Sequence, residues 1–184
     1  MQNSYLIIGV FVLIGFFLVA QYNKLVRLNV TVDEAFGQIE VQLQRRADLI
    51  PNLIETVKGY AAHEKTTLES VTNARTQSVQ AQSFEQVAAA DNSLTSALRG
   101  LLAISESYPD LKASENFRAL QEELSSTENK IGFARQYYND NVSSLNQSVI
   151  SIPGKFFAGP AKVVARDFYV VNDPANREVP KVQF

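Results

Sequence analysis

The hydrophobic pattern separates a uniformly apolar start from a long amphipathic remainder. Residues 5–22 carry no charged side chain, and the first Lys, Arg, Asp or Glu along the chain is Lys24. As a helix, this stretch would be about 27 Å long, close to the thickness of the hydrocarbon layer of a bilayer. A cleavable signal peptide would need a basic start and a small-residue cleavage site, which this stretch provides poorly. The sequence therefore predicts an uncleaved transmembrane anchor over residues 1–23.

Beyond Asn29, apolar residues recur at alternating spacings of three and four residues. This spacing is typical of helices that pack against one another along one face. One apolar stripe covers residues 36–74, a second covers residues 84–108, and a third covers residues 117–149. The remainder of the chain is therefore expected to be helical.

Short polar motifs and a proline predict where these helices begin and end. Thr31-Val-Asp-Glu34 and Ser83-Phe-Glu-Gln86 have the spacing of a capping box, in which side chains bond the free amides of the first helical turn. Pro109 disfavours helix in the residue before it, and Ser114 can begin the next helix. The sequence predicts helices over residues 32–80, 84–108 and 114–150.

The expected fold class is all-α, with an N-terminal transmembrane helix followed by an antiparallel bundle of three to four long helices. The short connections force neighbouring helices to run in opposite directions. The bundle would cover residues 24–150. Prolines and glycines become frequent after Ile152, so residues 151–184 are predicted to be an irregular tail with one short extended segment at residues 168–171.

The lengths of the first two predicted helices do not match. A helix over residues 32–80 would be about twice as long as the one that follows it. One alternative is a single long helix that bends at Pro51, and it is favoured because the stripe keeps its phase. The other is a break near Pro51 or Gly59, which would give four shorter helices.

A long first helix would leave part of its stripe without a partner inside the chain. The residues concerned are Phe36, Ile39, Leu43 and Ile50. They would expose more apolar surface than monomers usually tolerate in one patch. The sequence therefore predicts a homo-oligomer, in which Arg46 on the same stripe would pair with Glu40 or Asp48 of a neighbouring chain.

Composition and motifs exclude several classes of function. A net charge of −2 provides no basic surface for nucleic acid, and the absence of cysteine excludes thiolate chemistry and disulfides. The sequence contains no glycine-rich phosphate loop, dinucleotide fingerprint or nucleophile-elbow motif. We therefore predict no catalytic, cofactor-binding or metal-binding residue.

Two polar groups were candidates for chemistry, and both are interpreted as structural. His63 and Glu64 are adjacent on a helix, so their side chains project about 100° apart and do not converge on a metal ion. We interpret His63 as a solvated or packing residue. The second group consists of Glu122, Glu123, Glu128 and Arg135. We interpret these residues as forming ion pairs between helices. Arg46 would either extend its head group to solvent or meet an acid from another helix or subunit.

Several of these segments resemble one known family. They are QLQRRADLIPNLIETVKGY at residues 42–60, YPDLKA at residues 108–113 and FARQYYND at residues 133–140. The closing stretch VPKVQF at residues 179–184 completes the pattern. Together these stretches resemble the bacterial LemA family.

The resemblance implies a non-enzymatic, single-pass protein of the bacterial inner membrane, with its N-terminus outside and its bundle in the cytoplasm. Lys24 and Arg27 follow the apolar stretch and no Lys or Arg precedes it, so the positive-inside rule predicts the same orientation. Membrane lipid would contact residues 5–22. The expected function is a self-associating scaffold that binds protein partners in envelope stress. The alternative is a regulatory subunit or adaptor of a membrane metalloprotease.

Overall fold

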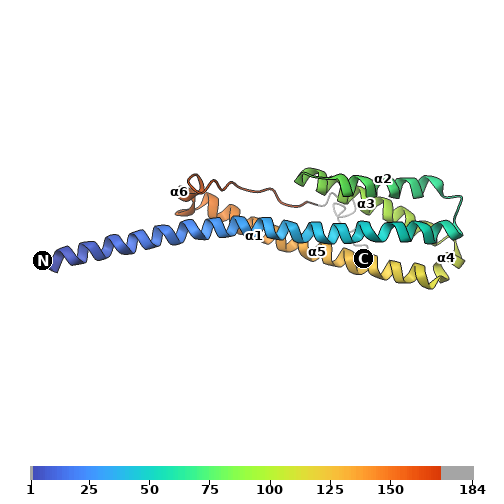
Figure 1. Ribbon diagram of the computed structural model, residues 1–184, viewed down its shortest axis with the longest axis horizontal. Coiled ribbons are helices and arrows are strands. Elements are labelled where there is room, and N and C mark those ends of the chain that lie inside the picture. The colour runs from blue at the N-terminus through green and yellow to red at the C-terminus, as the bar shows by residue number, and fades with distance from the viewer. Residues whose placement is uncertain (1, 171–184) are drawn as a thin grey trace, which may run out of the picture. The chain divides into compact units, whose positions relative to one another are not determined.

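The computed structural model describes the backbone of residues 2–170, and over these residues the chain forms helices and no strands. Side chains are described for Tyr5 and for residues 7–170. The elements are α1 (Gln2–Tyr60), α2 (Lys65–Gln80), α3 (Phe84–Ser105), α4 (Pro109–Ala113), α5 (Glu115–Ile150) and α6 (Gly154–Ala158) (Figure 1). The prediction of an all-α fold is confirmed.

α1 is one uninterrupted helix, although the sequence predicted a new helix near Thr31. The hydroxyl of Thr31 donates to the carbonyl of Arg27 at 3.0 Å, one turn earlier, and so does not cap a helix. Residues 23–31 contain neither proline nor glycine, so nothing interrupts the main-chain hydrogen bonds. The apolar stretch and Arg46 therefore lie on the same continuous helix.

The expected single helix over residues 32–80 is wrong, and a break close to Gly59 is what the structure shows. α1 passes through Pro51 without ending there. It ends at Tyr60, and α2 begins at Lys65. The stretch that was expected to form one helix is therefore divided between the end of α1 and α2.

α2 folds back along the end of α1. The guanidinium Nε of Arg75 donates to the carbonyl of Ala47 at 2.9 Å, which places the second half of α2 beside the last quarter of α1. This reversal turns the apolar face of α2 inward and buries Leu68, Val71 and Ala74. Burial of these side chains favours the break, because a straight helix would have left them in water.

The other helix boundaries follow local signals in the sequence. The main-chain N–H of Gln86 donates to the Ser83 hydroxyl at 3.2 Å, and the Gln86 side chain accepts the Ser83 N–H at 3.3 Å, so the predicted capping box is confirmed. α3 ends at Ser105, a little before the predicted end, because Pro109 begins the short helix α4. α5 follows directly after Ser114.

The helices belong to two compact units. One contains the chain through Gln38 together with Ala134–Phe168, and the other contains Ile39–Phe133 together with the chain from Tyr169. We call the first the membrane-proximal unit, because it includes the apolar stretch of α1 that the sequence predicts to be a membrane anchor. We call the second the core unit. Both α1 and α5 contribute residues to each of them.

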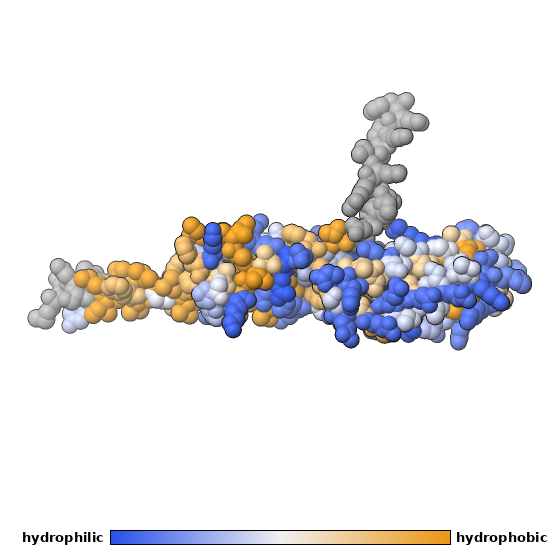
Figure 2. Space-filling view, turned by 90° about the horizontal axis from the view of Figure 1, so that it is seen from above, coloured by the Kyte–Doolittle hydropathy of each residue, from blue (hydrophilic) through white to orange (hydrophobic). Residues whose placement is uncertain are grey.

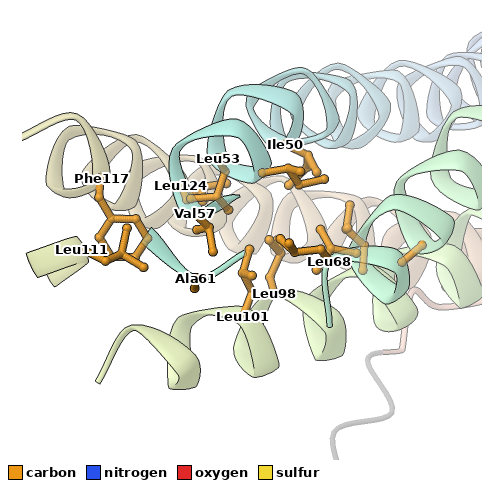
Figure 3. Close-up of a cluster of buried hydrophobic side chains, with 14 residues drawn as sticks. Ile50, Leu53, Val57, Ala61, Leu68, Leu98, Leu101, Leu111, Phe117 and Leu124 are labelled. Atoms are coloured by element: carbon orange, nitrogen blue, oxygen red, sulfur yellow. The ribbon is translucent and has the colours of Figure 1, made fainter. Parts of the chain in front are cut away.

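The core unit is held together by apolar side chains from several helices. Figure 3 shows them meeting in one cluster, which includes Leu53 and Val57 of α1, Leu68 of α2, Leu98 and Leu101 of α3 and Leu124 of α5. Leu53 and Leu101 have no exposed surface. Leu111 of α4 and Phe117 of α5 close one end of the cluster (Figure 3).

The part of the first stripe that was expected to be exposed is buried instead. Ile39 and Ile50 have no exposed surface, and Leu43 is 5% exposed. The ring of Phe36 packs against the ring of Tyr138, with centroids 5.9 Å apart. The surface that was expected to drive assembly is thus inside the chain, and the reason given for a homo-oligomer through these residues is wrong.

In the membrane-proximal unit, α1 and α5 run antiparallel and the chain after α5 packs on them. The Tyr138 hydroxyl donates to the carbonyl of Asp167 at 3.0 Å. Burial is the main cause that raises the pKa of the Tyr138 hydroxyl above its ordinary value, and the charge of Arg166 opposes this shift. Tyr138 therefore stays a neutral hydrogen-bond donor at neutral pH.

Arg166 fixes the returning chain to both helices. Its main-chain N–H donates to Asn146 Oδ1 and its carbonyl accepts from Asn146 Nδ2, both at 2.9 Å. Its guanidinium donates to Asn29 at 3.2 Å and to Asp33 at 3.0 Å. These bonds join residues that are far apart in sequence.

The tail is more structured than the sequence predicted. It contains α6, and Val163 and Tyr169 are buried. The expected extended segment at residues 168–171 is not a strand through Val170. Val171 and the closing residues 179–184 lie outside the described residues.

Candidate functional site

The candidate site is a group of charged and polar side chains inside the core unit, centred on Arg46. The apolar stripe of α1 turns this arginine inward, where it is 1% exposed. Its Nη2 donates to Asp91 Oδ1 of α3 at 2.6 Å. Its Nη1 donates to Glu128 Oε2 of α5 at 2.8 Å and to Thr95 Oγ1 of α3 at 3.0 Å. One guanidinium thus joins three helices.

Asp91 is the second buried charge of the site. Its side chain is 1% exposed, and its other carboxylate oxygen accepts from the Tyr169 hydroxyl at 2.7 Å. The Tyr169 ring meets the ring of Phe84 edge-on, with centroids 5.7 Å apart. Both oxygens of the carboxylate are therefore engaged, and the chain after the membrane-proximal unit is bound to the core unit through Tyr169.

The two charged side chains of the site that are shielded from water, Arg46 and Asp91, have opposite charges that cancel. Arg46 and Asp91 form an ion pair out of contact with solvent, whereas the Glu128 side chain is 45% exposed and borders water. Burying two ions costs several kcal/mol unless good geometry and further hydrogen bonds compensate for the lost hydration. The short, charge-assisted bonds here provide that compensation. The arrangement is suited to holding helices in register.

A groove lies beside this ion pair. It has a volume of about 360 Å³ and is lined by Arg46, Glu128 and other residues of α3 and α5. The apolar lining residues are Leu98, Leu102 and Leu124. The polar lining residues are Thr95, Arg99, Gln121, Ser125 and Asn129. An apolar floor with a polar rim can accept an apolar side chain of another molecule and bond its polar neighbours.

Two residues of the predicted acidic group form ion pairs between helices, as expected. Glu128 pairs with Arg46, and Glu123 pairs with Arg45 of α1 at 2.9 Å. Glu122 is exposed on α5. Arg135 belongs to the membrane-proximal unit, whereas the three glutamates belong to the core unit.

The expected partners of Arg46 are also corrected. Asp91 of the same chain takes the place that was assigned to Glu40 or Asp48 of a neighbouring chain. Asp48 instead accepts a hydrogen bond from Gln44 at 2.7 Å on the exposed side of α1. The ion pair therefore forms within one chain and needs no second copy.

His63 is exposed in the turn between α1 and α2. Its neighbour Glu64 accepts a hydrogen bond from the Tyr108 hydroxyl at 3.1 Å. This bond is the main cause that raises the pKa of Tyr108. Across the described part of the chain, no group of three His, Asp or Glu residues is placed to hold a metal ion.

Sequence reasoning missed Asp91, Thr95 and Tyr169 as members of the site. Asp91 gave a usable signal, because it occupies an otherwise apolar stripe position, as Arg46 does. Two opposite charges on two stripes that pack together predict a buried ion pair. Tyr169 gave no such signal, because it belongs to a tail without periodic pattern.

Comparison with known proteins identifies the family. The model of the LemA family matches residues 35–184. The chain belongs to the LemA family. This confirms the resemblance inferred from the sequence, and every residue of the site around Arg46 lies within the matched part. The apolar stretch of α1 precedes it.

Curated relatives of this LemA-family chain carry two kinds of name. Magnetosome protein MamQ 2 of Paramagnetospirillum magneticum is 23% identical over 184 residues, which cover 85% of this chain and 68% of the relative. Magnetosome protein MamQ of Magnetospirillum gryphiswaldense is 24% identical over 181 residues, covering 83% and 66%. Protein LemA of Metamycoplasma hominis is 28% identical over 145 residues, covering 78% and 65%. None of these names denotes an enzyme.

Proposed function

We propose that this LemA-family chain is a membrane-anchored, non-enzymatic scaffold that binds protein partners at the cytoplasmic face of the bacterial inner membrane. The observation that carries the proposal is the apolar stretch of α1. Its side chains are exposed, and it passes without a break into the helix that supports the two units. The anchor and the folded part are thus one continuous element.

The apolar stretch has the length and composition of a membrane span. Every side chain of residues 7–20 is exposed, and Phe11 and Phe16 are 69% and 75% exposed. Each Å² of such surface costs about 25 cal/mol in water, and a bilayer removes this cost. Figure 2 shows the same contrast, with an apolar N-terminal end and a hydrophilic surface over most of the core unit.

Anchoring and orientation are tested with reporters fused after Phe184. We expect a fluorescent protein that folds in the cytoplasm to be active and alkaline phosphatase to be silent, because Lys24 and Arg27 favour the cytoplasmic side. Leu13→Arg with Ile14→Arg should move the protein out of the carbonate-resistant membrane fraction, since each charge costs about 3 kcal/mol at the centre of a span.

Two results would contradict this part of the proposal. Extraction of the wild type by carbonate would show that the apolar stretch does not span the membrane. Activity of alkaline phosphatase alone would show the reverse orientation, and the partners would then be outside the cytoplasm.

The groove beside Arg46 is the surface that we propose for a protein partner. Its floor includes Leu98 and Leu124, which are each 7% exposed, and its rim includes the exposed side chains of Gln121 and Ser125. An apolar floor of this kind suits one or two anchoring side chains of an amphipathic helix, and the rim suits its polar flanks. These features support a binding role over a catalytic one.

The partner role is tested by site-specific photocrosslinking in cells. A photoreactive residue at Ser125 lies in the groove, and the same residue at Ser126 is exposed on α5 outside the lining. We expect a defined crosslinked product at Ser125, with a yield several times higher than at Ser126. Leu102→Gln should lower the yield at Ser125. Equal products at both positions would contradict the groove. Recovery of a membrane metalloprotease in fixed proportion would favour the adaptor alternative over the scaffold.

A further inference from the structure

We infer that residues 150–162 form a second membrane contact, which rests in the anionic headgroup layer beside the point where α1 leaves the bilayer. We call these residues the docking segment. The inference rests on the proposed anchoring of α1, and it assigns a lipid-binding surface to a part of the tail that the anchor itself does not require.

The docking segment exposes large apolar side chains close together. Ile150 is 71% exposed, Ile152 is 76% exposed and Phe156 of α6 is 70% exposed. Figure 2 shows apolar side chains gathered at the position that α6 has in Figure 1, next to the apolar part of α1. An apolar patch of this kind on a folded protein marks a surface that another apolar phase or molecule covers.

The register of α1 against α5 places this patch at the level of the membrane surface. The rings of Phe36 and Tyr138 are in contact, and the two helices run antiparallel in one unit. At 1.5 Å per residue, Ile150 lies about 18 Å beyond Tyr138 along α5. Lys24 lies the same distance before Phe36 along α1. The end of α5 is therefore level with Lys24, immediately after the apolar stretch ends.

The charges around the docking segment match an anionic surface. Residues 1–32 and 141–166 contain no Asp or Glu, and they contain five basic residues: Lys24, Arg27, Lys155, Lys162 and Arg166. Lys155 and Lys162 are exposed, whereas Arg166 is engaged with Asp33. Basic side chains that lie close to exposed Phe and Ile side chains are typical of segments that rest in the headgroup layer of anionic membranes.

A second membrane contact would restrict how the membrane-proximal unit can rotate and tilt relative to the bilayer. A single span leaves the membrane-proximal unit free to rotate about the axis of the span. Insertion of Ile152 and Phe156 beside it would fix that rotation and the tilt of α1. The face that carries the docking segment would then always turn toward the lipid, and the opposite face would stay open to the cytoplasm.

The test uses the full chain reconstituted in vesicles of phosphatidylcholine and phosphatidylglycerol. The sequence contains no cysteine, so single cysteines can carry an environment-sensitive fluorophore. Phe156→Cys reports on the docking segment, and Leu13→Cys reports on the anchor. Asp140→Cys is the matched control, because it is exposed on the same helix α5 and about 15 Å before Ile150.

We expect the probe at residue 156 to be quenched by lipids with a nitroxide near the headgroup more than by lipids with a deep nitroxide. The probe at residue 13 should show the opposite preference, and the probe at residue 140 should be quenched by neither. Lys155→Gln, or vesicles of phosphatidylcholine alone, should reduce the docked population, by about fivefold for the loss of one basic charge. Far-UV circular dichroism checks that each variant is folded.

The outcomes separate the inference from the proposed anchor. Quenching at residue 13 without quenching at residue 156 would overturn the docking segment and leave the anchor in place, and the patch would then be a candidate for a protein contact. A lack of quenching at residue 13 would overturn the anchor itself. Docking that is unchanged without phosphatidylglycerol and with Lys155→Gln would overturn the assignment to anionic lipid.

Discussion

Arg46→Met is expected to lower the free energy of unfolding by about 3 to 5 kcal/mol, because it leaves a buried carboxylate without its cation. Asp91 is 1% exposed, and the variant removes its 2.6 Å ion pair while the hydrogen bond from the neutral Tyr169 hydroxyl stays. The bonds to Thr95 and Glu128 are lost at the same time. The measurement is urea unfolding of the full chain in detergent, followed by far-UV circular dichroism.

Arg45 provides the matched control. It has the same side chain at the adjacent position, but its pair with Glu123 is exposed, with side-chain exposures of 47% and 52%. Arg45→Met should therefore cost less than about 1 kcal/mol. Arg46→Met combined with Asp91→Leu should recover much of the loss, because replacing both buried ions removes the unpaired charge. Equal effects of the two single arginine variants would show that the buried pair does not stabilise the core unit.

Leu53→Ala is expected to destabilise the protein by about 2 to 5 kcal/mol, because it leaves a cavity at the centre of the core unit. Leu53 has no exposed surface and meets side chains of the other core helices (Figure 3). Thermal unfolding of the full chain in detergent measures the change.

Two nearby substitutions serve as controls for Leu53→Ala. Val41 is an apolar residue of the same helix that is 64% exposed, so Val41→Ala should change stability by less than about 0.5 kcal/mol. His63→Ala should be equally mild and should leave function intact, because His63 is exposed in a turn. Loss of cellular function in His63→Ala with normal stability would contradict the structural interpretation of this histidine.

The sequence predicted those features that depend on local periodicity. The three stripes identified the buried faces of the helices, since residues three and four apart share one face whatever the helix packs against. The Ser83 cap and the stop before Pro109 are likewise local, because each depends on neighbouring main-chain groups. These features were right for physical reasons that need no knowledge of the tertiary fold.

The break after Tyr60 depended on tertiary packing, and the sequence offered it only as the less favoured of two alternatives. The stripe kept its phase through Tyr60, Glu64 and Thr67, and this continuity favoured one long helix. None of these three side chains is buried, and the polar character of Glu64 and Thr67 was the signal available in the sequence. The gain from packing α2 on α3 decides between a turn and a continuous helix, and propensity alone does not contain that gain.

The candidate site was predictable only in part. Arg46 was identified as a charged residue on an apolar stripe, and Glu128 as an acid that pairs with another helix. Asp91, the second acid that Arg46 binds, depends on the register of α1 against α3, which only the tertiary fold sets. Tyr169 depends on the path of the tail, which no periodic pattern indicates.

The bonds of Arg166 have a consequence for the order in which the chain folds during synthesis. The core unit consists mainly of the consecutive residues 39–133, so its helices can condense as soon as they leave the ribosome. The membrane-proximal unit joins Asn29 and Asp33 to Arg166, and these contacts must wait until nearly the whole chain has been translated. Residues 24–38 of α1 thus emerge long before their packing partners. We expect them to be the segment that chaperones or the insertion machinery must protect while translation continues.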